Sequence, residues 1–223
     1  MKEFLEKVRT QMPCFVNYNG VTYHDVVKIK KSYDAIFIGT HDERKGIFDL
    51  IKTWHHVTSF IPGAKLVTCG FIPSENRKRI IEEISKLRLR DNIFIKGPVS
   101  ERMKVELLAS SKLFILPSKH EAFPLVVGEA FAAGLPVIAY NISAFKDPFF
   151  TNCKAFITCP VGDTKSLARE ISKLLKNPIQ LSNLANEAKN YIKMYSWDAI
   201  MIREREIYIK VLKDFANRKS LKI

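Results

Sequence analysis

Short apolar runs alternate with longer amphipathic stretches along most of the chain. Six of the runs are predicted strands, and several of them are apolar almost throughout, which is typical of strands whose two faces are both covered by helices. These runs are residues 35–39, 65–70, 92–97, 113–117, 136–140 and 155–159. The pattern predicts a parallel sheet of about six strands.

The stretches between the runs carry apolar residues at helical spacing. Two stripes are formed by Ile80, Ile81, Ile84 and Leu87, and by Leu167, Ile171, Leu174 and Leu175. Ser100 and Asp163 stand where two helices should begin, and both residue types are good N-caps. The repeated strand-then-helix order predicts a doubly wound, Rossmann-like α/β fold with right-handed crossovers.

Both ends of the chain depart from this alternation. Residues 1–33 predict an irregular lead-in, with a short helix and then an extended piece that reaches a turn at Asn19-Gly20. Residues 34–177 are the predicted α/β domain, and residues 178–223 are expected to form helices packed on that same domain. Seven apolar residues fall near one face of a long terminal helix: Trp197, Ile200, Met201, Ile207, Val211, Leu212 and Phe215.

The chain has 223 residues and a formal net charge of +13, which favours an anionic partner such as a phosphorylated ligand, a lipid surface or nucleic acid. The basic residues are spread over predicted helix faces, so a solvated basic surface explains the charge more simply than any one partner. Most aromatic residues fall in strand-like or core-facing positions, which argues against a nucleic-acid-binding protein.

Two further features bear on the compartment. No apolar run approaches the roughly 20 residues needed to span a bilayer, and the first residues are charged, unlike a secretory signal. We therefore expect a soluble, cytoplasmic protein, with peripheral contact to the inner membrane surface left open. The cysteines Cys14, Cys69, Cys153 and Cys159 are too scattered for a CxxC metal site, so buried, reduced thiols are expected.

The ends of the predicted strands are where a ligand is expected. Ligands of open α/β sheets bind outside the carboxyl ends of the strands. Glycines follow three of these strands, at Gly39, Gly70 and Gly97, and glycine lets a ligand approach the backbone closely.

The segment after the fourth strand carries the most chemistry. Pro124 suits the first position of a helix, and the amides that follow it would be unpaired and ready to bind phosphate oxygens. Glu121 precedes this helix and Glu129 lies inside it among apolar neighbours. Carboxylates at such places suit sugar hydroxyls, because each carboxylate can accept several hydrogen bonds.

Seven short motifs occur in one order along residues 17–212. They are Asn19-Gly20-Val21, Phe37-Ile38-Gly39 with Lys45-Gly46, Asp91-Asn92-Ile93 before Gly97, Phe114-Ile115-Leu116-Pro117-Ser118, Glu121-x7-Glu129, Ala132-Ala133-Gly134-Leu135-Pro136-Val137 and Ser196-Trp197. Each motif alone is common, but together they resemble the C-terminal domain of the retaining GT-B glycosyltransferases of family four.

The resemblance implies a nucleotide-diphospho-sugar donor, sugar transfer with retention and no essential metal. Lys45 would contact the donor diphosphate, Glu121 the sugar hydroxyls and Glu129 the ribose hydroxyls. Glu121 and Lys45 are thus the expected catalytic residues, with an orienting role for Glu121 favoured over a nucleophilic one. The implied donor-binding set is Gly39, Thr40, Lys45, Gly97, Val99, Glu121, Phe123, Leu125, Val126 and Glu129. In this set the amides near Leu125 and Val126 would meet the phosphates, and Gly97 to Val99 would border the base.

The chain departs from the family pattern at three positions and in one larger respect. Thr40 stands where the family usually has an arginine, which Arg44 is a candidate to replace, and Ala122 and Pro124 stand where the family usually has glycine. No sequence before residue 34 could form the acceptor-binding domain of the family. The chain is therefore an excised half, a short protein, or one that works with a second domain, a second copy or a membrane. The acceptor is not implied.

Alternatives from other classes stay open at this point. A non-catalytic nucleotide-sugar-binding subunit or regulator would share every residue named above, and a sugar-nucleotide epimerase would share the architecture. The adjacent His55 and His56 face different ways on a predicted helix, which makes them a poor metal pair.

Overall fold

The computed structural model describes residues 15–22 and 29–220, with side chains to residue 216, and contains one six-stranded parallel sheet. The strands are β1 (Tyr33–Ile38), β2 (Leu66–Cys69), β3 (Ile93–Ile95), β4 (Ser111–Leu116), β5 (Val137–Tyr140) and β6 (Phe156–Cys159). Each predicted run overlaps one of them, with β1 and β4 beginning two residues before their predicted runs, so the predicted Rossmann-like sheet is confirmed. All four residues of β2 and of β5 are buried, as expected for strands covered on both faces.

The strands lie in the order β3-β2-β1-β4-β5-β6. Ile36 of β1 is in register with Val67 of β2 on one side and with Phe114 of β4 on the other. The chain therefore winds outward in both directions from the β1/β4 pair. In such sheets the crevice between the two central strands, at their carboxyl ends, is the usual ligand site.

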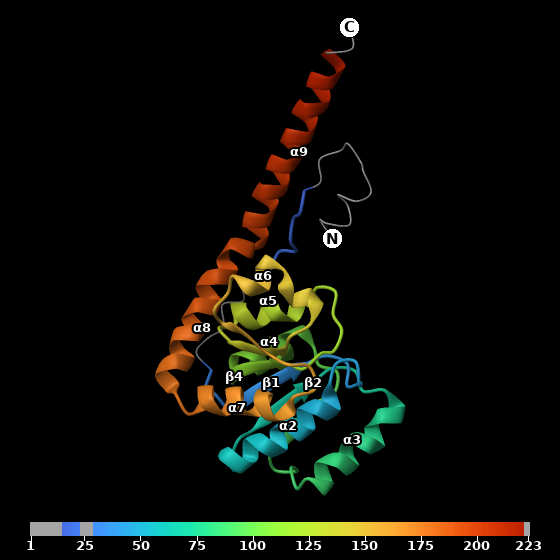
Figure 1. Cartoon of the computed structure of the whole chain (residues 1–223), viewed down its shortest axis with the longest axis vertical. Coiled ribbons are helices and arrows are strands. Elements are labelled where there is room, and N and C mark those ends of the chain that lie inside the picture. Colours follow the sequence, from blue (N-terminus) through green and yellow to red (C-terminus); the bar gives the residue numbers. More distant parts are fainter. Residues whose placement is uncertain (1–14, 23–28, 221–223) are drawn as a thin grey trace.

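Helices cover both faces of the sheet (Figure 1). The helices α2 (Ile47–Phe60), α3 (Ser74–Lys86) and α7 (Thr164–Leu175) lie on one face, where α2 packs on α7. The helices α4 (Glu101–Ala109) and α5 (Leu125–Ala132) lie on the other face, and α8 (Pro178–Ile192) packs on α5. Short elements, η1 (Ser143–Lys146), α6 (Pro148–Thr151) and η2 (Lys193–Tyr195), complete the domain.

The predicted caps are confirmed and one predicted stripe needs correction. Ser100 accepts a hydrogen bond from the amide of Met103, and Asp163 accepts one from the amide of Ser166. The apolar stripe of α3 was predicted to include Ile81, but that side chain is 54% exposed while Ile80 is buried. Successive residues of a helix differ by about 100°, and the buried residues of α3 are Ile80 and Ile84, which share one narrow face.

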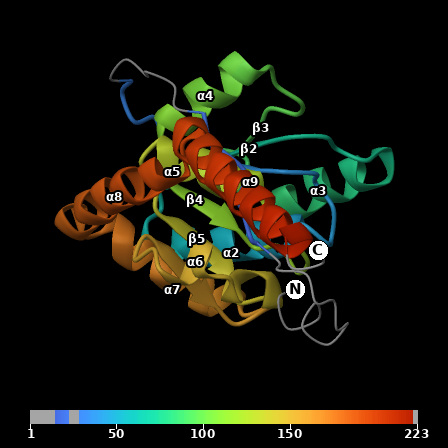
Figure 2. The ribbon, with the colours of Figure 1, turned by 90° about the horizontal axis from the view of Figure 1, so that it is seen from above.

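The last helix, α9 (Trp197–Ser220), begins on the domain and then extends beyond the other helices (Figure 1). Figure 2 shows that α8 and α9 point in different directions from their junction. Ile200 is buried, whereas five of the seven apolar residues predicted near one face are exposed: Trp197, Met201, Val211, Leu212 and Phe215. The division of the chain at residues 33/34 and 177/178 stays a prediction.

A short N-terminal segment runs beside the start of α9. The amide of Val21 donates to the carbonyl of Tyr195 at 2.8 Å, and a Cβ at Gly20 would overlap the indole ring of Trp197. The glycine of the predicted Asn19-Gly20 turn is thus required by the close approach of this ring. The predicted N-terminal helix lies outside the described residues. Within the described ranges, no helix is both long and apolar enough to cross a membrane.

Candidate functional site

The glycines after three strands extend the sheet beyond its regular ladder. The amide of Gly39 donates to the carbonyl of Cys69 at 3.0 Å, and the amide of Gly70 donates to the carbonyl of Gly97 at 2.8 Å. Gly70 has a φ of 135°, and a Cβ at this position would overlap the carbonyl of Gly39. The backbones of these strand ends therefore lie side by side at a distance that only glycine allows.

The loops after β1 and β4 pack directly on one another. Gly46 has a φ of 78°, and a Cβ at this position would overlap the carbonyl oxygen of Pro117. The amide of Lys119 donates to the carbonyl of Arg44 at 2.9 Å. Because β1 and β4 are the central pair of the sheet, these contacts join the two loops at the place where a ligand is expected.

Lys45 and Glu121 meet across these two loops. The Lys45 ammonium lies 2.6 Å from Oε1 and 2.8 Å from Oε2 of Glu121. Their side chains are only 19% and 6% exposed. The backbone amide of Lys45 also donates to Asp42 at 2.7 Å, which fixes the loop around it. The structure therefore brings together the two residues expected to act on the donor.

Helix α5 begins shortly after Glu121 in the chain. Pro124 was predicted at the first helical position, but it is the N-cap, with an extended backbone (ψ of 103°), and the helix begins at Leu125. Proline has no side-chain acceptor that could cap the helix. The backbone carbonyl of Pro124 accepts a hydrogen bond from the amide of Val127 at 3.1 Å. Leu125 and Val126 hold the first two helical positions, whose amides have no acceptor inside a helix. Such amides suit an anion.

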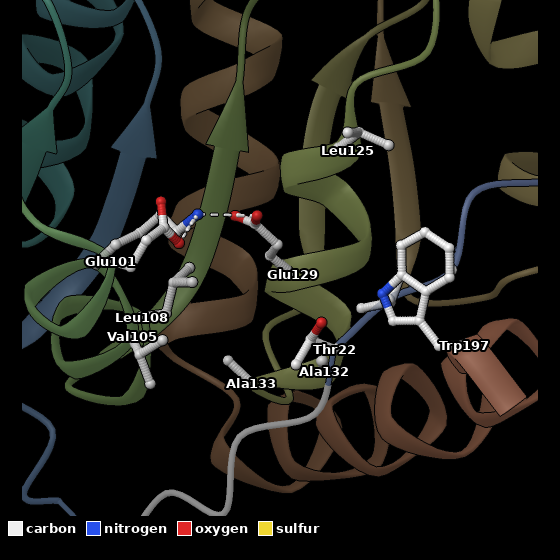
Figure 3. A pocket seen from close by; sticks show the side chains of 12 residues that line it. Thr22, Glu101, Val105, Leu108, Leu125, Glu129, Ala132, Ala133 and Trp197 are labelled. Carbon is white, nitrogen blue, oxygen red and sulfur yellow. Dashed lines mark hydrogen bonds and ion pairs between the residues drawn. The ribbon is translucent and has the colours of Figure 1, made fainter.

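A cavity of about 250 Å³ lies between α4 and α5 (Figure 3). Its walls are mainly apolar, and Glu129 of α5 faces Glu101 of α4 across it, with Trp197 on the far side. The Lys104 ammonium lies 2.9 Å from Glu129 and 2.8 Å from Glu101. Leu125 also lines the cavity, whereas Lys45 and Glu121 do not.

The charges at this cavity reinforce each other. Burial alone would lower the pKa of Lys104, but its hydrogen bonds to Glu101 and Glu129 outweigh burial, and the pKa is raised. Lys104 thus stays a cation opposite the Glu129 carboxylate at neutral pH.

Cys69, at the end of β2, is buried, and burial raises the pKa of its thiol to about 11.

His41 has a structural position behind the strand ends. Its Nδ1 lies 3.1 Å from the carbonyl oxygen of Gly39, and its Nε2 lies 2.9 Å from Oγ1 of Thr68. The side chain is fully buried, and burial lowers the pKa of the imidazole. A neutral imidazole with both nitrogens engaged holds the end of β1 in place.

The remaining predicted site residues include Phe123, Thr40, Val99 and Arg44. Phe123 packs in an aromatic cluster, with ring centroids 5.0 Å from Phe149 and 5.5 Å from Phe150. Thr40 and Val99 are partly buried. Arg44, the candidate replacement for the missing arginine, pairs with Asp42 at 3.9 Å. In the part of the chain that the structure describes, no group of three or more His, Cys, Asp or Glu side chains could hold a metal ion.

Sequence reasoning missed Lys104 and Asp42. Asp42 is three residues before Lys45, the spacing of a turn in which a side chain accepts the backbone amide. Lys104 is three residues after Glu101 on a predicted helix, which signals a pair on one helix face. Its bond to Glu129 depends on how α4 and α5 face each other, and no local pattern reports this.

Comparison with known proteins assigns the chain to a family. Residues 22–191 match the family described as glycosyl transferases group 1. The chain belongs to this family. A curated relative, the N-acetyl-alpha-D-glucosaminyl L-malate synthase of Bacillus anthracis, is 27% identical over 213 residues, which are 92% of this chain and 54% of that enzyme. An exopolysaccharide phosphotransferase of Streptomyces coelicolor is 34% identical over 152 residues, 68% of this chain but 16% of that protein.

Solved structures of GT-B glycosyltransferases share the fold of this group 1 chain. S. aureus TarM, solved with Fondaparinux, alpha-GlcNAc-glycerol and UDP, superposes with a TM-score of 0.77 at 21% identity. The match covers 94% of this chain and 41% of TarM. The group 1 domain thus spans about half, or less, of the length of these relatives.

Proposed function

We propose that this chain is the donor-binding half of a retaining glycosyltransferase of family four, which transfers a sugar from a nucleotide-diphospho-sugar to an acceptor. The observation that carries the proposal is the Lys45–Glu121 pair at the junction of the two central loops. A cation and a carboxylate held in contact there supply one group for the diphosphate and one for the sugar hydroxyls.

In this proposal the diphosphate lies between Lys45 and the start of α5. The amides of Leu125 and Val126 would donate to phosphate oxygens, and the positive end of the helix dipole would add to the charge of Lys45. Charge builds on the diphosphate as it leaves the sugar, so fixed positive groups at this place would stabilise the transition state. Lys45 would turn from Glu121 towards the phosphates as the donor enters.

The sugar and nucleoside would lie on opposite sides of the diphosphate. Glu121, freed from Lys45, would accept hydrogen bonds from sugar hydroxyls and orient the ring, without acting as a nucleophile. Glu129 would accept the ribose hydroxyls, and Gly97 to Val99 would border the base. Because the cavity between α4 and α5 includes Glu129 and Leu125, it provides room for part of the nucleoside.

Relatives support the donor class and suggest the first probe. TarM was solved with UDP, and the B. anthracis relative is named for transfer of an N-acetylglucosaminyl group. UDP-sugars are therefore the first donors to test on this chain, followed by ADP- and GDP-sugars. The role of each group described above needs no essential metal.

The acceptor would bind to a second domain, a second copy or another chain. The matched part makes up 54% of the B. anthracis relative and 41% of TarM, and α9 presents exposed apolar side chains that such a partner could cover. A cytoplasmic setting, with peripheral membrane contact, fits this proposal. We expect the chain alone to bind donor but to transfer sugar slowly, since a closed cleft positions the acceptor and excludes water.

A thermal-shift screen with UDP, ADP, GDP and their sugars tests the donor proposal, because a ligand that binds only the folded state raises its melting temperature. A rise of several degrees with one nucleotide family supports the proposal. No shift with any of them at millimolar concentration contradicts it. A radiolabel transfer assay with the purified chain separately tests whether it needs a partner; rapid transfer would contradict that part.

A further inference from the structure

Lys104 is the one side chain described here that links α4 to a proposed donor-binding carboxylate. Its ammonium lies 2.9 Å from Oε1 of Glu129 and 2.8 Å from Oε2 of Glu101. The Lys104 side chain is 17% exposed, far less than the 90% of Arg102, which pairs with Glu106 on the same helix. The Lys104 pair is therefore a partly buried contact between two helices, unlike the surface pairs around it.

The contact crosses a cavity. Figure 3 shows the interaction drawn from α4 to Glu129, with the apolar side chains of Val105 and Leu108 below it. Without this partner the Glu129 side chain would have several rotamers open to it, since the cavity offers space and its described lining includes no other Lys or Arg. Lys104 selects one of these orientations.

The chemistry of a carboxylate leaves room for a ligand beside Lys104. Each carboxylate oxygen can accept about two hydrogen bonds, so a single bond from Lys104 to Oε1 leaves acceptor capacity on both oxygens of Glu129. Two neighbouring hydroxyls of a ribose can each donate a hydrogen bond, one to each oxygen of a carboxylate whose orientation is fixed. A carboxylate that swings freely would bind the diol less selectively.

We propose that Lys104 is a positioning residue that holds Glu129 in the orientation needed to recognise the ribose diol. The proposal rests on the proposed function, because it assumes that a nucleotide binds at Glu129. It goes further in assigning the selection of ribose over deoxyribose to an ion pair between α4 and α5. A merely structural role for Lys104 would instead change the stability of the fold or the affinity for every nucleotide equally.

The test is calorimetry with UDP, ADP and GDP and with their 2′-deoxy counterparts. The wild-type chain should prefer the best ribonucleotide over its 2′-deoxy form by about tenfold or more, the value of a hydrogen bond to a charged group. Lys104→Met should bring this ratio close to one. Lys104→Arg, which keeps the charge, should preserve most of it. Arg102→Met is the matched control, because Arg102 lies on the same helix, pairs with Glu106 rather than Glu129 and is 90% exposed; it should keep the wild-type ratio.

Each outcome decides a different claim. A wild-type ratio in Lys104→Met overturns the inference, as does a wild-type chain that binds ribo- and deoxynucleotides equally, and both leave nucleotide binding intact. Absence of binding by the wild-type chain overturns the proposed function and this inference together. Far-UV circular dichroism and melting temperature establish that each variant is folded; if Lys104→Met unfolds, Lys104→Gln replaces it with the same expected ratio.

Discussion

The ammonium of Lys45 contacts both carboxylate oxygens of Glu121, at 2.6 and 2.8 Å, although 76 residues separate the two in the chain. Parallel strands place the loops after β1 and β4 at one edge of the sheet, and the approach of Gly46 to Pro117 closes the remaining gap. The pair means that each residue already has a partner before a donor arrives. In the proposed function, donor binding would therefore exchange this ion pair for new contacts.

Glu121→Gln should separate the affinity for nucleotide from the affinity for nucleotide-sugar. The substitution frees Lys45 from a competing carboxylate, so UDP should bind as tightly as to the wild-type chain, or more tightly. The sugar would lose a charged acceptor, so UDP-glucose or UDP-N-acetylglucosamine should lose about 1.5–3 kcal/mol relative to UDP. Calorimetry with both ligands measures the difference. An equal loss for UDP and the UDP-sugar would place Glu121 away from the sugar.

Lys45→Met should weaken both folding and nucleotide binding. The Glu121 carboxylate, only 6% exposed, would lose its cation, which costs about 3 kcal/mol of unfolding free energy, the low end for a broken buried ion pair. Adding Glu121→Gln should recover stability but not binding. Urea unfolding and calorimetry on the single and double variants give the two readouts. The control is Lys78→Met, because that side chain is 87% exposed and should be neutral in both.

Stability unchanged by Lys45→Met would show that Glu121 is satisfied without Lys45. Recovery of binding in the double variant would show that the diphosphate does not need this cation.

Gly46→Ala should loosen the contact between the two loops. The residue has a φ of 78°, and its Cβ would overlap the carbonyl of Pro117, so the loop must move. Holding a residue other than glycine in this region costs about 1–3 kcal/mol. Gly63→Ala is the matched control, since a Cβ there meets nothing within 4 Å. Chemical unfolding of both variants measures the costs, and equal stability of the two would contradict the packing described.

The buried thiols should resist alkylation in the folded chain. Burial raises the pKa of Cys69, Cys153 and Cys159 to about 11, so at pH 8 each stays protonated as well as inaccessible. In a Cys14→Ser background, iodoacetamide should label the native chain very slowly and all three thiols after unfolding. Above pH 9 the unfolded chain loses these protons first, so stability should fall as the pH rises towards 11. Rapid native labelling at pH 8 would show that the core around them opens.

An element of this fold could be predicted from the sequence where local residues or burial on both faces determine it. The central strands are buried on both faces, so their residues are apolar almost without interruption, and β2 and β5 could be predicted from that alone. The caps at Ser100 and Asp163 depend on neighbouring residues only. The prediction for Ile81 was wrong because its exposure depends on how much of α3 the rest of the fold covers, and only the face with Ile80 and Ile84 is buried.

The site was less accessible to sequence reasoning. Lys45 and Glu121 could be linked only through resemblance, because their contact depends on tertiary structure. The bond between Lys104 and Glu129 crosses a cavity between two helices, and no spacing along the chain encodes it. Pro124 was placed one residue too far into its helix, a boundary that local residue preferences fix poorly.

A crystal structure of the chain with the nucleoside diphosphate that binds best tests the central claim most directly. We predict the diphosphate at the amides of Leu125 and Val126, with the Lys45 ammonium within about 3 Å of a phosphate oxygen and turned away from Glu121. The ribose hydroxyls should lie on Glu129. A nucleotide bound elsewhere, with the Lys45–Glu121 pair intact, would contradict it.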